Sequence, residues 1–356
     1  MALTAQDVQN TQNKVKHSVL PLAEIIKRRG TGKRASYLVE GIIAEKSVNI
    51  GVGDSGIGKS PLAYQMGLCV ASGKPFLGRA VKQGRVIYAD LENGEDQLSD
   101  IALALARHLE LPEIPPEFHL LVDRDDCSRL GGIIAEMRPA LVIIDSLRAF
   151  RPDAEEKSRT ATTLLNMLRE LAREFATSIL LLHHIRKSVD DENVAPIDST
   201  NVMDWLTVAC GSRSLINQTD TRIAFGPCPT QKTNKKKGQE EDTPESLLRD
   251  SVGLVMRWAE RSRGQSAPLY LSRVMDADGE PLGYQAMTGP ELLFNDRMKE
   301  FWYELPRDRE FTFTEAKEIY QRAAPATKNW LAKCMAVGIV HQLGKGLPYR
   351  VIEPAG

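Results

Sequence analysis

Short runs of consecutive apolar residues recur along the first two thirds of the chain and alternate with longer segments of helical spacing. In the helical segments, such as 61–71 and 163–175, apolar residues recur every three or four positions. Continuous apolar runs of about five residues are typical of parallel strands covered by helices on both faces. The pattern therefore predicts an α/β fold with a mainly parallel central β-sheet flanked by helices. The runs that we interpret as its strands are 48–52, 85–91, 118–122, 141–145, 178–182 and 222–226.

The second half of the chain departs from this alternation. Residues 186–204 are polar and lack periodicity, which predicts a long loop. Residues 229–246 have the charged, low-complexity composition of a disordered surface loop. Three strand-like runs follow at 252–259, 268–275 and 283–287, with glycine-containing turns between them. This spacing predicts a β-meander.

The last segment, residues 291–356, shows a different order of elements. Three helical segments are followed by two strand-like segments joined by a glycine-containing turn, which is the order of a winged helix. We therefore expect an N-terminal arm or linker over 1–35, a large α/β domain over 36–290 and a small winged-helix domain over 291–356. The elements predicted in the last part are helices at 294–305, 313–322 and 325–337 and strands at 339–342 and 349–352.

Composition narrows the class of protein only slightly. Hydrophobic residues make up 42% of the chain and charged residues 26%, as in ordinary globular proteins. The net charge of −1 excludes a general polycation, so any nucleic-acid contact must come from local basic patches. The five cysteines are scattered without metal-binding spacing, the N-terminal stretch lacks the apolar core of a signal peptide, and no apolar run is long enough to cross a bilayer. We expect a protein of the reducing cytoplasm with no membrane partner.

The strongest chemical signal is the sequence GDSGIGKS at residues 53–60, between a predicted strand and a predicted helix. It matches the phosphate-binding loop, or P-loop, in which glycines let successive backbone N–H groups face a phosphate. In this pattern Lys59 reaches the β- and γ-phosphates of ATP, and the Ser60 hydroxyl binds Mg²⁺. Pro61 has no N–H, so one donor of the usual cradle is missing. The predicted nucleotide-binding residues are Gly53, Asp54, Ser55, Gly56, Ile57, Gly58, Lys59, Ser60 and Pro61.

Two acidic residues follow predicted strands at the same edge of the sheet. Asp145 ends the run LVIID, where a carboxylate can hold Mg²⁺ through water. Glu92 follows the run RVIYADL, where it can orient or deprotonate the attacking water, and Asp90 is the alternative two residues earlier. The simpler interpretations are a capping role for Asp145 and a solvated acidic turn for Glu92.

Histidines and arginines beyond the strands complete the set of candidates. His183 and His184 end the run SILLLHH, where one of them can touch the γ-phosphate or relay its presence. Arg213 and the pair Arg261 and Arg263 are candidates for an arginine that reaches the γ-phosphate bound by a neighbouring subunit, a contact worth a large rate factor. For each arginine site taken alone, a surface salt bridge is an equal alternative.

Taken together, these motifs resemble those of the RecA-type ring ATPases, especially the RepA-like hexameric replicative helicases and more distantly the DnaB and RadA groups. The resemblance covers about residues 36–290, and it implies a RecA-like core. The His-His-x-Arg-Lys element favours the RepA-like group. The resemblance rests on GDSGIGKS at 53–60, VIYADLEN at 86–93, LVIIDSL at 141–147 and ILLLHHIRKS at 179–188, with GSRSL at 211–215 and RSRG at 261–264 in support.

The resemblance also implies residue roles. Arg213 is implied as the finger that acts on a neighbouring subunit, with Arg263 as the alternative. RepA-like proteins often have Arg-Gly where this chain has Cys210 and Gly211, which weakens this assignment. The remaining implied roles are phosphate and Mg²⁺ binding for Lys59 and Ser60, catalytic base for Glu92, Mg²⁺-linked acid for Asp145 and phosphate sensor for His184.

Family members bind single-stranded DNA in the channel of the ring, through loops that here correspond to 148–158 and 185–210. The winged helix departs from the minimal family pattern. Because it is only weakly basic, it is equally consistent with DNA binding and with protein docking. The residues implied for DNA binding are Arg148, Arg151, Arg186 and Lys187 in the loops and Lys328 and Lys333 in the third helix of the winged helix.

The function that we expect is a DNA-stimulated ATPase that forms a homo-oligomeric ring, a hexamer in this family. It would use ATP and Mg²⁺ and act as a helicase or translocase on single-stranded DNA, with replication or recombination proteins as partners. One alternative is a regulatory switch in which ATP controls oligomeric state and the winged helix binds DNA or a partner. Pro61 and the weakly basic channel loops favour this alternative slightly. A third interpretation is a loader or recombination mediator that remodels another DNA-bound protein.

Overall fold

The computed structural model describes twelve stretches of the chain, which form two compact units, Met1–Ser36 and Tyr37–Gly356. In the first unit the described element is the short helix α2 (Leu22–Arg29), with Leu22, Ile25 and Ile26 exposed. The described residues are 21–29, 36–122, 129–185, 197, 201–210, 213–227, 252–261, 264–287, 302–321, 323–336, 339–344 and 346–351.

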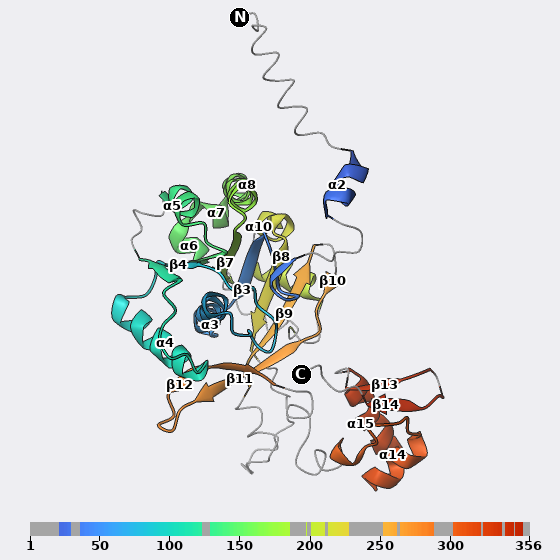
Figure 1. Cartoon of the computed structure of the whole chain (residues 1–356). Coiled ribbons are helices and arrows are strands. Elements are labelled where there is room, and N and C mark those ends of the chain that lie inside the picture. Colours follow the sequence, from blue (N-terminus) through green and yellow to red (C-terminus); the bar gives the residue numbers. More distant parts are fainter. Residues whose placement is uncertain are drawn as a thin grey trace, which may run out of the picture. The chain divides into compact units, whose positions relative to one another are not determined.

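Ten strands of the second unit form one twisted sheet (Figure 1). It joins the predicted parallel strands and the predicted β-meander, which the sequence analysis had not placed in one sheet. Its strand order is β12-β11-β9-β8-β3-β7-β6-β4-β5, with β10 paired to β9 outside this path. Six neighbouring strands are parallel: β5 (Phe118–Leu121), β4 (Val86–Asp90), β6 (Leu141–Asp145), β7 (Ser178–His184), β3 (Val48–Gly53) and β8 (Thr221–Gly226). The antiparallel extension consists of β9 (Val252–Glu260), β10 (Gly264–Gln265), β11 (Leu269–Met275) and β12 (Pro281–Ala286).

Both faces of the central parallel strands are buried, because alternate side chains enter two different hydrophobic clusters. Ile179 and Leu181 of β7 pack into one cluster, and Leu180 and Leu182 pack into the other. The second cluster is covered by α3 (Lys59–Ser72) and α4 (Glu95–His108). The first is covered by α5 (Leu130–Met137), α6 (Leu147–Phe150), α7 (Asp153–Glu156), α8 (Ser158–Glu174), α9 (Val202–Cys210) and α10 (Arg213–Gln218). The predicted α/β fold with a mainly parallel, helix-flanked sheet is confirmed. A two-stranded hairpin, β1 (Tyr37–Val39) and β2 (Ile43–Ala44), precedes the sheet.

Two segments that the sequence analysis took as loops contain helices. Residues 148–158 contain the end of α6, all of α7 and the first residue of α8. The Ser146 side chain caps α6 by accepting a hydrogen bond from the Ala149 N–H. Within 185–210 the chain forms α9, because the Asn201 side-chain oxygen accepts the N–H groups of Met203 and Asp204 and so caps the helix start. Most of the predicted loop at 186–204, and all of 229–246, lie outside the described residues.

The C-terminal segment has an apolar cluster of its own, built around Trp330, Phe311 and Leu331. It contains α14 (Phe313–Tyr320), α15 (Ala324–Ala336) and an antiparallel hairpin of β13 (Val340–Gln342) and β14 (Tyr349–Val351). Thr312 and Glu315 form a capping box that fixes the start of α14. The described elements follow the predicted order, but most of the first predicted helix (294–305) lies outside the described residues, so the winged helix stays a prediction.

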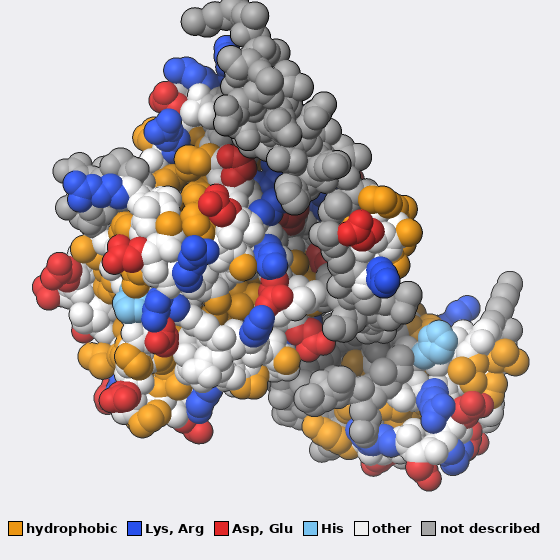
Figure 2. Space-filling view, turned by 45° about the horizontal axis from the view of Figure 1, so that its top comes forward, with side chains coloured by type: hydrophobic (Ala, Val, Ile, Leu, Met, Phe, Trp, Pro, Cys, Tyr) orange, Lys and Arg blue, Asp and Glu red, His pale blue; other side chains and the backbone are white. Residues whose placement is uncertain are grey.

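Two observations bear on the kinds of partner that the protein could bind. In the described part of the chain, no helix combines the length and the apolar character needed to cross a lipid bilayer. On the face that Figure 2 shows, Lys and Arg side chains are interspersed with Asp and Glu side chains. Any attraction to nucleic acid on this face would therefore depend on small groups of basic residues and not on a broad positive field.

Candidate active site

The P-loop lies where the sequence placed it, at the carboxyl end of β3 and at the start of α3. Gly56 and Gly58 have positive φ angles of 74° and 107°, which residues with side chains rarely adopt, and they turn the backbone into the helix. Asp54 and Ser55 are exposed, and the Ser55 N–H donates to Asp54 Oδ1 at 2.7 Å. The N–H groups at the start of α3 can therefore bind an anion in front of the loop.

Lys59 is the buried cation of this loop. Its side chain is only 3% exposed, and its Nζ donates to the carbonyl oxygen of Gly53 at 2.9 Å and to that of Asp54 at 2.5 Å. The same Nζ lies 3.2 Å from His184 Nδ1. Burial lowers the pKa of Lys59, although the charges of Asp145, Asp54 and Glu92 act in the opposite direction. A phosphate beside the ammonium group would supply the close anion that offsets this burial.

Asp145 and Ser60 form the part of the site that suits Mg²⁺. Asp145 ends β6, is 2% exposed, and accepts hydrogen bonds from the hydroxyls of Ser60 and Tyr88, the latter at 2.7 Å. Burial raises the pKa of Asp145, and these two hydrogen bonds counteract the rise. A hydroxyl and a carboxylate are hard oxygen ligands of the kind that Mg²⁺ prefers. The described residues contain no group of three or more His, Cys, Asp or Glu side chains that could hold a metal ion.

The two candidates for the catalytic base have different surroundings. Asp90 is 1% exposed and already occupied: it accepts from the Tyr64 hydroxyl at 3.0 Å and from the backbone N–H groups of Glu92 and Asn93. Asp90 therefore holds the turn after β4. Glu92 is 41% exposed, faces the cavity and accepts a hydrogen bond from the Ser146 hydroxyl. Of the two, Glu92 is the carboxylate that water at the site can reach.

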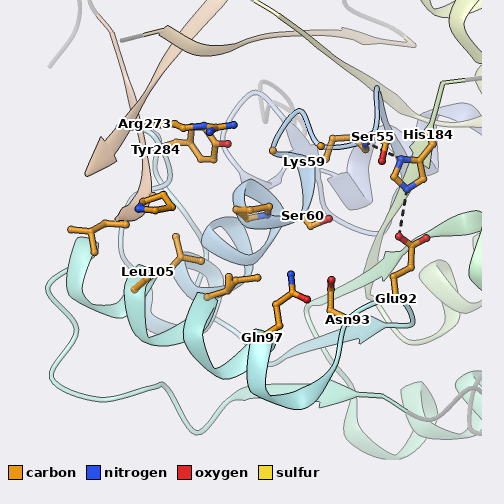
Figure 3. A pocket seen from close by; sticks show the side chains of 18 residues that line it. Ser55, Lys59, Ser60, Glu92, Asn93, Gln97, Leu105, His184, Arg273 and Tyr284 are labelled. Carbon is orange, nitrogen blue, oxygen red and sulfur yellow. Dashed lines mark hydrogen bonds and ion pairs between the residues drawn. The ribbon is translucent and has the colours of Figure 1, made fainter. Parts of the chain in front are cut away.

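His184 lies between the ammonium group of Lys59 and the carboxylate of Glu92. Its Nδ1 contacts Lys59, its Nε2 lies 3.6 Å from Glu92 Oε2, and it is one quarter exposed (Figure 3). His183 points the other way: it is 3% exposed and its Nδ1 lies 3.1 Å from Glu155 Oε1. The strand alternation thus separates the two histidines, and His184 is the one placed at the site.

A cavity of about 370 Å³ adjoins the P-loop and is lined by residues from four places in the chain, one of them His184 of β7. Besides the P-loop, α4 contributes an apolar side with Ile101, Ala104 and Leu105, and the antiparallel extension contributes Arg273 and Tyr284. Figure 3 shows Arg273 and Tyr284 at the end of the cavity away from Glu92 and His184. Sequence analysis missed this side of the site, together with Asn93 and Gln97, because no motif marks it.

The predicted residues beyond the cavity are placed as follows. Arg213 is the exposed first residue of α10, on a helix that packs against α8 and α9, and it does not line the cavity. Arg148 in α6 and Arg151 just after it are exposed, and so is Lys328 in α15. Arg263, Arg186 and Lys187, and the side chain of Lys333, lie outside what the structure describes.

The hydroxyl of Tyr88 gives a prediction about pH. Because it donates to Asp145, Tyr88→Phe should raise the pKa of Asp145 further, so the acid form of Asp145 should persist to higher pH. The acidic limb of the pH profile of ATP hydrolysis should then shift towards higher pH, with weaker Mg²⁺ activation near that limb. Tyr64→Phe is the matched control, because Tyr64 stacks on Tyr88 with ring centroids 3.8 Å apart but donates to Asp90. If the acidic limb of the pH profile does not shift in Tyr88→Phe, or shifts equally in both variants, then the Tyr88 hydroxyl does not control the protonation of Asp145.

Comparisons with known proteins gave one family match and two similar solved structures. Residues 16–190 match the family model described as "AAA domain". Two solved structures with similar folds are a KaiC-like protein, PH0186, from Pyrococcus horikoshii OT3 and the RadB recombinase. The first is 14% identical, with 72% of this chain and 99% of that chain covered at a TM-score of 0.43. The second is 17% identical, with 68% and 92% covered at a TM-score of 0.44. A comparison with curated proteins gave no match.

Proposed function

We propose that this chain is a RecA-like P-loop ATPase that hydrolyses ATP with Mg²⁺ and couples hydrolysis to movement on single-stranded DNA; the match of residues 16–190 to an AAA domain supports the ATPase part. The observation that carries the hydrolytic part is the meeting of Lys59, His184 and Glu92 at one edge of the sheet, beside Ser60 and Asp145. A phosphate-binding cation, a metal-binding pair and a carboxylate open to water are the parts that phosphoryl transfer to water requires.

Each residue has a separable task in this reaction. The backbone N–H groups of the P-loop and Lys59 bind the phosphates and hold the γ-phosphate in place. Ser60 and Asp145 would hold Mg²⁺, which would supply positive charge to neutralise the phosphates. Glu92 orients the attacking water and accepts its proton, while the Ser146 hydroxyl fixes one carboxylate oxygen so that the other faces the site. His184 is placed to report on the γ-phosphate, because it touches both Lys59 and Glu92.

We further propose that the active form is a ring, a hexamer, in which each ATP site receives an arginine from the neighbouring subunit. Arg213 is exposed and is absent from the lining of its own subunit's cavity, which is what such an arginine requires. Arg263 remains the alternative.

The DNA-binding part of the proposal rests on the segment that follows β6. Arg148 and Arg151 are exposed there, and α6 is capped by Ser146, whose hydroxyl donates to Glu92. Single-stranded DNA bound by these arginines would thus act on α6, the helix whose capping residue Ser146 holds the Glu92 carboxylate. This short connection supplies a physical route by which DNA changes the rate of hydrolysis.

The double substitution Arg148→Ala and Arg151→Ala tests this route. If the two side chains contact two phosphates, the slope of log affinity for single-stranded DNA against log salt should fall by about 1.4. Stimulation of ATP hydrolysis by single strands should be lost, while hydrolysis without DNA stays near the wild-type rate. Arg173→Ala, on the exposed face of α8, is the control. A double variant with the wild-type salt slope and stimulation would exclude the segment as the DNA contact.

A second candidate function is an ATP-dependent switch or recombination mediator that acts through its C-terminal segment. The feature that favours it is Pro61, which removes one donor from the phosphate cradle and so suits a slow ATPase. Slow hydrolysis that ignores single strands would support this candidate over the translocase.

A further inference from the structure

The cradle of this P-loop lacks one donor, and the missing donor has a definite place. Pro61 is the third residue of α3, in the helix turn whose free N–H groups would otherwise point at a bound phosphate. Proline is tolerated there by the helix, since the Leu62 N–H still donates to the Gly58 carbonyl at 3.3 Å. The fold is therefore intact, and the deficit falls on the phosphate nearest the ribose, the α-phosphate.

A strand from the far end of the sheet is fastened to this helix. The Gln65 side chain of α3 donates to the Tyr284 carbonyl at 2.7 Å and accepts the Tyr284 N–H at 2.9 Å. His108 of α4 lies 3.0 Å from the same carbonyl oxygen. Both helices that border the cavity thus bind the backbone of β12 at Tyr284, so the position of this strand relative to the P-loop is fixed.

The Tyr284 side chain lies directly against the P-loop. A Cβ atom added to Gly58 would lie 1.9 Å from the Tyr284 hydroxyl, and Tyr284 is only 4% exposed. The phenol therefore occupies the space that glycine leaves open at the last turn of the loop before Lys59.

Arg273 stands beside this phenol. The two residues are opposite each other in the antiparallel pairing of β11 and β12, so their side chains lie on one face of the sheet. Burial raises the pKa of Tyr284, and the charge of Arg273 together with a hydrogen bond between the two side chains counteracts the rise. Arg273 lines the cavity, is exposed, and forms no ion pair with a carboxylate of the described residues. A guanidinium without an acidic partner in a phosphate site is available to bind phosphate.

We infer that Arg273, positioned by Tyr284, contacts the α-phosphate of the bound nucleotide within the same subunit and supplies the interaction that Pro61 cannot make. The cavity has two ends: Glu92 and His184 mark the γ-phosphate end, and Arg273 and Tyr284 lie at the other (Figure 3). An arginine at this second end binds ATP and ADP alike. It is a binding residue and not the arginine that a neighbouring subunit directs at the γ-phosphate. The inference rests on the proposed ATP-binding function.

The test is equilibrium binding of MgADP and of a slowly hydrolysed ATP analogue to the full chain. Arg273→Ala should weaken both by about 10- to 100-fold, the range expected for loss of a hydrogen bond to a charged group. Tyr284→Phe should weaken both nucleotides less, because it removes the support and leaves the charge. Gln285→Ala, an exposed neighbour on β12, is the control and should bind as wild type does.

Restoring the missing donor provides a second, independent measurement. Pro61→Ala returns an N–H to the helix turn, so it should recover much of the affinity that Arg273→Ala loses. Thermal melting of each variant identifies any that fails to fold, and the Tyr284→Phe and Pro61→Ala results then carry the test.

Three outcomes would overturn the inference: unchanged affinity in Arg273→Ala, a loss confined to the ATP analogue, or no recovery on adding Pro61→Ala. Lys59→Ala separates this failure from failure of the proposed function. If Lys59→Ala also binds both nucleotides as tightly as wild type, the site does not bind nucleotide and the proposed function itself is wrong.

Discussion

Replacing Lys59 by alanine should lower the rate of ATP hydrolysis by about 100- to 1,000-fold, the usual cost of removing a preorganised donor to the reacting group. Lys59 is the buried cation of the P-loop, held at the carbonyl oxygens of Gly53 and Asp54 and beside His184. Without it, the charge that develops on the γ-phosphate loses its nearest positive group. The measurement is steady-state hydrolysis by the purified chain across a range of ATP and Mg²⁺ concentrations.

The loss must be shown to come from the site and not from the fold. Burial lowers the pKa of Lys59, which means that keeping the charged ammonium group buried lowers the free energy of unfolding. Removing it should therefore leave the chain folded, as thermal melting would show. Lys74→Ala is the matched control, because Lys74 lies just after α3, outside the P-loop, and its Nζ donates to the Glu110 carbonyl. Hydrolysis by Lys59→Ala at the control's rate would mean that the P-loop is not the catalytic site.

Glu92→Gln should lower hydrolysis by about 100- to 10,000-fold while nucleotide binding persists, because glutamine keeps the shape of the side chain but cannot accept the proton of the attacking water. Its amide oxygen can still accept the Ser146 hydroxyl, so the local contacts should remain. Bound ATP should then be recovered intact from the variant. Hydrolysis and nucleotide retention would be measured on the same preparation.

Substitutions of two nearby acidic residues serve as comparisons for Glu92→Gln. Glu95, the first residue of α4, is exposed and does not line the cavity, so Glu95→Gln should hydrolyse ATP as wild type does. Asp90 holds Tyr64 and the turn that carries Glu92, so Asp90→Asn should lower the thermal stability as well as the rate. A fully active Glu92→Gln would show that another group activates the water.

The parts of the fold that sequence reasoning found were those that depend on local pattern. The buried strands β6 and β7 were predictable because each contains a continuous apolar run, and β3 because its short β-rich run leads into the P-loop. Their carboxyl ends define the edge where Lys59, Asp145 and His184 meet. The P-loop was predictable because its glycines, lysine and serine occur at fixed spacing.

The parts of the fold that sequence reasoning missed depend on contacts between residues far apart in the sequence or on a single helix-capping residue. The helices α6 and α7 have four residues each, too few to show periodicity, and α9 begins at a cap made by the Asn201 side chain. Tyr284 reaches the P-loop through a pairing with Gln65 that spans 219 positions, and neither residue belongs to a motif. Such tertiary contacts leave no local signal in the sequence.

The proposed motor, driven by ATP on single-stranded DNA, is tested most directly by the rate of ATP hydrolysis with and without single strands, with Lys59→Ala as the blank. The account predicts strong stimulation by single-stranded DNA that disappears in Lys59→Ala and weakens in the Arg148 and Arg151 double variant. Hydrolysis that is abolished in Lys59→Ala but is the same with and without single strands would contradict the motor, and it would favour the ATP-dependent switch.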